Sequence, residues 1–206
     1  MHIYSIGAII GDVLNTKTEL IILIAVIAAC AGCAGPGGTG LDNETVSLGG
    51  VSIHPPEGEM WKMTSRDAKQ VTFMRKTEKG REHSVTAFAM LLPRPKAVTD
   101  GKSLLKYALQ ATMEGYRDKR YTLRDSNAWL ETGKNGERAV VKFSAEDRGV
   151  PWNPGEIYIM SGEDAYFLHP NGKTLLLLAE SQRFPAGATT LDLGPELAPF
   201  KASAGN

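Results

Sequence analysis

Thr174-Leu175-Leu176-Leu177-Leu178 is the stretch that decides the fold of this 206-residue chain. The Asn171-Gly172 pair just before it is typical of a tight turn between strands, because both residue types tolerate positive φ angles. An unbroken apolar run next to such a turn is typical of a strand that is covered on both faces. We therefore expect residues 174–178 to form a central strand of a sheet.

The segments around this strand also alternate between apolar runs and turn residues. Residues 71–76 and 84–92 are predicted to form a hairpin through Gly80, and residues 138–143 are predicted to follow the Asn135-Gly136 turn. Shorter strands are expected at residues 46–48, 51–53, 121–123, 128–130, 157–160 and 165–168, with Ser161-Gly162 as the turn between the last two. Hairpin connections of this kind favour antiparallel pairing.

One helix is predicted between the hairpin and the later strands. Thr99 and Asp100 are residue types that cap helix N-termini. Apolar residues then recur at steps of three and four, from Leu105 to Met113 and Tyr116, so that they share one wide face. The helix is expected to end near residues 117–120.

Strands joined by hairpins with one good helix predict an α+β fold, in which an antiparallel sheet carries one main helix packed on it. We expect one domain at residues 45–200, with a weak helix near residues 195–200 and a frayed tail at residues 201–206. A mature chain of roughly 175 residues suits one domain of this kind.

The order of these elements resembles the PsbP-like fold of small exported and lipid-anchored proteins. A strand runs through a proline-glycine turn from Ile53 to Trp61, a hairpin and a helix follow, and a meander ends at residues 175–181. The resemblance implies a binding or assembly-accessory role, because members mostly lack catalysis. It rests on element order across most of the mature chain, so it assigns no functional residues. A generic α+β sandwich is the alternative.

The N-terminal segment is predicted to be an export signal. Residues 20–29 form an apolar run behind Lys17, which supplies the preceding positive charge. The run is far shorter than the roughly twenty residues that a transmembrane helix requires, and it suits the apolar region of a signal peptide. We therefore assign residues 1–29 to the signal peptide.

The end of this run resembles the lipobox of bacterial lipoproteins, in which an aliphatic residue and two small residues precede a cysteine. Ile27-Ala28-Ala29-Cys30 matches this pattern, and Cys30-Ala31-Gly32-Cys33 is the alternative match. The resemblance implies cleavage before the cysteine, a diacylglycerol on its thiol and often an acyl chain such as palmitate on its amino group. Two or more acyl chains anchor a protein stably. We expect lipidation at Cys30, with Cys33 as the alternative.

The residues that follow predict where the domain is held. Ala31 rather than aspartate after Cys30 favours, by resemblance to lipoproteins of two-membrane bacteria, the outer membrane facing the periplasm. Residues 30–44 are glycine-rich and are expected to form a flexible tether. The small residues around Cys30 also fit ordinary secretory cleavage, which would give a soluble secreted protein.

Charge and cysteine content exclude several classes of function. The chain has 23 basic and 23 acidic residues and a formal net charge of +0, so it lacks the positive field of a nucleic-acid-binding protein. Both cysteines precede the predicted domain, which therefore has no disulfide framework or cysteine metal site. We predict no cofactor.

No convincing catalytic or metal-binding motif is present. The histidines His54, His83 and His169 form no close ligand pair, and no G-x-S-x-G motif occurs. The acidic residues Glu146, Asp147, Glu156, Glu163 and Asp164 could serve as acid and base, but solvated acids in loops are the simpler interpretation. We therefore name no catalytic, cofactor-binding or metal-binding residue.

The segment at residues 147–156 is the best candidate for recognition. It contains Trp152 between two prolines, with Arg148 and Asn153 beside it. Exposed aromatic residues and arginines often anchor interfaces. These three residues are therefore candidates for partner binding, and the alternative is that Trp152 folds back as a lid on the sheet edge.

The sequence thus favours a lipid-anchored cell-envelope protein with a non-catalytic binding or assembly-accessory domain. Its expected partners are the membrane, through the N-terminal lipid, and an envelope protein, but no nucleic acid. The alternative from another class is an envelope-anchored hydrolase that uses carboxylates in its loops.

Overall fold

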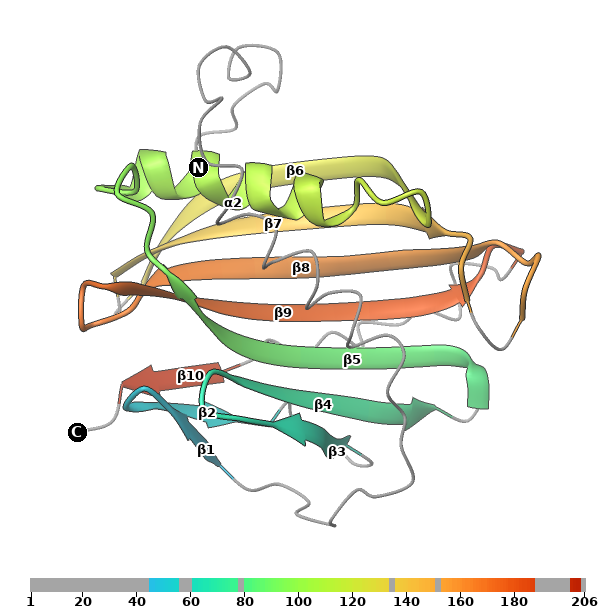
Figure 1. The fold of residues 1–206 in the computed structure, drawn as a ribbon, viewed down its shortest axis with the longest axis horizontal. Helices are drawn as coiled ribbons and strands as arrows, with labels where there is room; N and C mark the ends of the chain where they lie inside the picture. Colours follow the sequence, from blue (N-terminus) through green and yellow to red (C-terminus); the bar gives the residue numbers. More distant parts are fainter. Residues whose placement is uncertain are drawn as a thin grey trace.

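The computed structural model describes residues 45–55, 61–77, 80–133, 136–150, 153–187 and 201–204, within which it holds two antiparallel sheets and one helix (Figure 1). The elements are β1 (Val46–Leu48), β2 (Val51–His54), β3 (Trp61–Arg66), β4 (Gln70–Thr77), β5 (Gly80–Pro93), α2 (Gly101–Gly115), β6 (Tyr121–Gly133), β7 (Gly136–Asp147), β8 (Tyr158–Leu168), β9 (Thr174–Pro185) and β10 (Lys201–Ala204). The large sheet has the order β3-β4-β5-β9-β8-β7-β6, and the small sheet has the order β1-β2-β10.

β9 lies in the interior of the large sheet, between β5 and β8. Because successive side chains of a strand point to opposite faces, the leucine run supplies both faces of the sheet. Leu176 and Leu178 pack in the core that includes the small sheet, whereas Leu175 and Leu177 pack in the core that includes α2. The predicted strand that is covered on both faces is confirmed.

β1 and β2 belong to the small sheet and do not extend the large one. Their buried side chains cover one face of the large sheet. Val46, Leu48, Val51 and Ile53 pack in one cluster with Phe73 and with apolar residues of β5, β8 and β9. β10 pairs with the free edge of β2, where the sequence predicted only a frayed tail. The helix predicted near residues 195–200 lies outside the described residues.

α2 covers the opposite face, along the β6–β7 side of the large sheet (Figure 1). Its N-terminus is capped as predicted, because Asp100 Oδ1 accepts the Ser103 amide at 2.8 Å and Ser103 Oγ accepts the Asp100 amide at 3.0 Å. The buried face contains Leu104, Leu105, Ala108, Ala111 and Thr112. α2 ends at Gly115, shortly before the predicted end. It is too short to span a membrane, as is any other helical segment in the described ranges.

The predicted turn at Ser161-Gly162 is wrong, because β8 runs without interruption through both residues. Gly162 is required there by packing rather than by a turn. A Cβ atom at this position would lie 2.3 Å from the carbonyl oxygen of Glu180 and 2.7 Å from Cζ of Phe143. The two short strands predicted around residues 121–130 are likewise one long strand, β6.

The predicted fold class therefore needs correction. The described chain is mostly antiparallel strand, with two sheets and a single helix, rather than an α+β fold with one sheet. Element order alone, on which the PsbP-like expectation rested, did not predict this arrangement. The order was misleading because the first hairpin forms a separate layer with the C-terminal strand. The result is three layers: the small sheet, the large sheet and α2.

Candidate functional site

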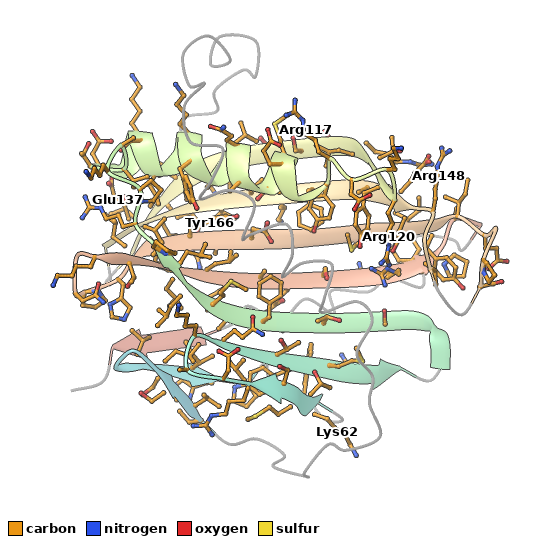
Figure 2. The ribbon with its side chains drawn as sticks, viewed as in Figure 1. Lys62, Arg117, Arg120, Glu137, Arg148 and Tyr166 are labelled. Atoms are coloured by element: carbon orange, nitrogen blue, oxygen red, sulfur yellow. The ribbon has the colours of Figure 1, made fainter. Side chains whose placement is uncertain are left out.

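The segment after α2 and the loop between β7 and β8 meet at one end of the large sheet. We call this region the loop end, and it comprises residues 116–124, 146–150 and 153–158. Figure 2 shows Arg117, Arg120 and Arg148 there. Asp147, the last residue of β7, lies opposite Tyr121 of β6 and Tyr158 of β8. β7 therefore delivers the carboxylate of Asp147 to the base of the loop.

Asp147 is fully buried and is bound by two arginines. Arg120 donates from Nε to Oδ1 at 2.7 Å and from Nη2 to Oδ2 at 2.8 Å. Arg183 Nε lies 2.9 Å from Oδ2, and the amide of Gly149 donates to Oδ1 at 3.0 Å. Burial raises the pKa of Asp147, but the hydrogen bond from Arg120 and the charge of Arg183 outweigh it, so the pKa is lowered. Asp147 is therefore a carboxylate at neutral pH.

The same cluster fixes the start of the loop. The Arg148 amide donates to the carbonyl oxygen of Arg120 at 2.9 Å. Gly149 permits this approach, because a Cβ atom there would lie 2.7 Å from Cγ of Arg120. Val150, the next residue, is buried. The loop is thus attached by backbone contacts as well as by the buried charge.

A second ion cluster lies on the other face of β7, where it is exposed. Arg124 Nη2 lies 2.6 Å from Glu146 Oε1, and Arg148 Nη2 lies 2.7 Å from Glu146 Oε2. The hydrogen bonds from Arg148 and Arg124 lower the pKa of Glu146. Arg148 is therefore exposed to solvent, but its guanidinium group is already paired with Glu146 of the same chain.

The far side of the loop is closed by short-range bonds. The Asn153 side-chain amide donates to Glu156 Oε2 and lies 3.5 Å from the Tyr158 hydroxyl. Ile157 is 38% exposed, although its carbonyl oxygen accepts the Ala186 amide at 2.9 Å. Trp152 lies outside the described residues. Of the three predicted partner-binding residues, Arg148 and Asn153 are therefore placed at the loop end.

A second buried carboxyl, that of Asp164, lies on the same face of the sheet beneath α2. Thr112 Oγ1 of the helix donates to Asp164 Oδ2 at 2.7 Å and lies 3.4 Å from the Tyr166 hydroxyl. Tyr107 packs edge-on against Tyr166, with ring centroids 6.0 Å apart. Burial raises the pKa of Asp164 to about 7, although the Thr112 hydrogen bond opposes that shift.

A cluster of aromatic side chains lies between these two carboxyl groups. Tyr116, which follows α2, stacks at a tilt on Phe143 with a centroid distance of 4.6 Å and meets Tyr121 edge-on at 5.5 Å. Burial raises the pKa of the Tyr116 hydroxyl well above its ordinary value, with a further contribution from the charge of Asp164. Tyr116 therefore stays neutral, and its ring packs between the end of α2 and the loop end.

The arrangement of carboxyl groups differs from the solvated loop acids that we expected. Asp147 and Asp164 are buried strand residues, and Glu146 and Glu163 are their neighbours on the opposite face. Of the histidines, His169 is buried in the β8–β9 turn, and Thr45 Oγ1 lies 3.1 Å from His54 Nδ1. The side chain of His83 lies outside the described residues. In the ranges described, no three acidic, histidine or cysteine residues gather closely enough to hold a metal ion.

Sequence reasoning missed both buried carboxyl sites. Asp147 stands next to Glu146 and Asp164 next to Glu163, so each pair looks like an ordinary solvated pair of acids. The alternation of strand β7 could have indicated that Asp147 shares a face with Val141, Phe143 and Ala145. Nothing local in the sequence indicates that Arg120 and Arg183, from distant segments, converge on Asp147.

Comparisons with known proteins give only low similarity. No family model matches the chain, and no curated protein matches it. Two structures of Mog1, the Saccharomyces cerevisiae Ran-binding protein and a Mog1 mutant, are each 13% identical to this chain with a TM-score of 0.39; the match covers 74% of this chain and 80% and 81% of theirs. Human STARD10 is 10% identical with a TM-score of 0.29, over 65% of this chain and 64% of its own. At these TM-scores the function has to be argued from the residues of this chain.

Proposed function

We propose that this protein is a lipid-anchored cell-envelope protein whose domain binds a protein partner through the loop end. The lipobox-like sequence ending in Cys30 supports the anchor, and the glycine-rich residues 30–44 support a flexible attachment. The outer membrane, with the domain facing the periplasm, is the location that Ala31 favours.

The observation that carries the binding proposal is the double attachment of the β7–β8 loop. Asp147 fixes its base from the buried face, and Glu146 fixes it from the exposed face through Arg148. Loop residues that are held in place before binding lose less conformational entropy when a partner docks. Ile157 offers exposed apolar surface within this fixed loop, and Trp152 belongs to the same loop in the sequence.

The hydrolase alternative fits these residues less well. Acid–base catalysis needs two carboxyl groups that reach one substrate and differ in protonation. Glu146 and Asp147 are each held by arginines that lower their pKa, and they point to opposite faces of β7. Asp164 has the pKa of a general acid, but it lies beneath α2 rather than at the surface.

Photo-crosslinking tests the binding surface. The photoreactive residue p-benzoylphenylalanine replaces Ile157 in the full chain, expressed in its native cells, and replaces Met113 as a matched control. Met113 has the same exposed fraction, 38%, but lies on α2. We expect a discrete protein adduct from position 157 and none from position 113. Equal adducts from both positions, or none from position 157, would contradict the proposal.

Metabolic labelling with a palmitate analogue tests the anchor. Cys30→Ser should abolish the label and release the protein from the membrane fraction, whereas Cys33→Ser should retain both. The reverse result would move the anchor to Cys33. Retention of the label in the double variant Cys30→Ser/Cys33→Ser would exclude lipidation at this motif.

A further inference from the structure

Asp164 lies in an apolar interface that offers its carboxyl group little stabilisation as an anion. Its neighbours across the sheet are Val141 of β7 and Ala179 of β9, both nearly fully buried. The hydrogen bond that the described structure gives it comes from the Thr112 hydroxyl of α2. Only 6% of Asp164 is exposed, so water replaces few of the missing partners. Burial of a carboxylate under these conditions favours the protonated form.

The charged and titratable groups around Asp164 do not compensate for this burial. α2 contributes Tyr107 and Tyr116, and β8 contributes Tyr166 on the same face and Glu163 on the opposite face. The facing positions of β7 and β9 are apolar. Arg183 lies four residues along β9 from Ala179, a distance of about 13 Å along a strand, and is bound to Asp147.

We propose that Asp164 is a pH-dependent latch between α2 and the large sheet. In its protonated form it bonds to Thr112 without a buried charge, and α2 is held firmly on β7 and β8. In its ionised form it leaves a charge beneath the helix that is relieved when α2 lifts and water reaches the carboxylate. The helix is therefore held less firmly as the pH rises.

The geometry also connects this latch to the loop end, and this second part rests on the proposed function. Thr112 lies one helical turn before Tyr116, which packs on Phe143. Arg120, four residues farther along the chain, holds Asp147 at the base of the loop. Movement of the last turn of α2 would disturb the Tyr116 packing first and the attachment of the loop next.

Hydrogen exchange detected by mass spectrometry tests the latch on the full chain without any partner. Protection of peptides from α2 is compared at about pH 5 and about pH 8 after correction for intrinsic exchange rates. With a folded-state pKa of about 7, we expect protection to fall by about a hundredfold, mostly below about pH 7. In Asp164→Asn, which cannot ionise, α2 protection should be independent of pH over this range.

Two further variants make the experiment specific. Glu163→Gln is the matched control, since it removes a carboxylate from the adjacent residue on the opposite face, and it should retain the pH dependence. Thr112→Val removes the donor that favours the anion, so the upper end of the transition should move to higher pH. This variant keeps the test decisive if Asp164→Asn fails to fold.

Constant α2 protection in the wild-type chain, or an unchanged pH dependence in Asp164→Asn, would overturn the latch. The crosslinking from position 157 and the exchange of α2 are separate readouts. The latch can therefore fail while the binding proposal stands, and the reverse also holds.

Discussion

Asp147 and Asp164 are the same residue type, buried on the same face of the large sheet, yet they differ in protonation. Asp147 has two arginines and the Gly149 amide as partners, and its pKa is lowered. Asp164 has the Thr112 hydroxyl, and its pKa is raised to about 7. Both carboxyl groups are desolvated, so the partners decide which form is stable.

This difference separates a permanent attachment from a conditional one. A carboxylate held by two guanidinium groups stays charged across the physiological range and fixes the β7–β8 loop throughout that range. A carboxyl group held by one hydroxyl changes its charge within that range. The loop end is thus built on the permanent site, and the seating of α2 depends on the conditional one.

The largest expected effect is that of Asp147→Asn. A neutral amide would leave the buried Arg183 and the partly buried Arg120 without their anion, and breaking a buried ion pair in this way destabilises proteins by about 3–5 kcal/mol. Urea unfolding of the full chain at neutral pH, followed by circular dichroism, measures the change. A loss no larger than that of a surface substitution would show that the cluster does not hold the fold.

Asp164→Asn should change how the unfolding free energy depends on pH. The pKa of Asp164 rises from 3.8 in the unfolded chain to about 7 in the fold. Its stabilisation is therefore complete below about pH 4 and is lost as the pH rises to about 7, by roughly 4 kcal/mol in all. The unfolding free energy of Asp164→Asn should lack this decline. Asp147, with a lowered pKa, loses its contribution only in more acidic solution, so the two profiles are distinguishable.

Gly162→Ala tests the packing that lies between the two carboxyl sites. The added methyl group would clash with the Glu180 carbonyl oxygen and with the Phe143 ring, which packs against Tyr116. Overpacking of this kind destabilises by about 1–3 kcal/mol. We expect the melting temperature to fall, and α2 exchange to become faster at both pH values. An unchanged melting temperature would mean that β8 and Phe143 adjust without strain.

The sequence predicted the parts of the fold that depend on local pattern. The leucine run predicted β9 as a central strand, and Asp100 predicted the start of α2, because periodicity and capping are local properties. The separate small sheet was not predicted, because β10 and β2 pair in it although most of the sequence separates them. Gly162 was misread as a turn residue because the Phe143 ring that requires it is also distant in sequence.

The candidate site was predicted only as a segment. Prolines and Trp152 indicated a loop with recognition potential, and Arg148 and Asn153 lie there. The functions of Asp147 and Asp164 depend on whether an arginine or a threonine reaches each of them in the folded state. Both acids lie in strands beside another acid, so the sequence alone does not distinguish them.

Glu146→Gln should have the smallest effect and sets the lower limit of the comparison. Glu146 binds two arginines, as Asp147 does, but its cluster is exposed, where water stabilises the separated charges nearly as well. We expect no measurable change in melting temperature, with faster hydrogen exchange confined to the β7–β8 loop after Arg148 is released. A destabilisation as large as that of Asp147→Asn would show that the number of arginines, rather than burial, decides the strength of these attachments.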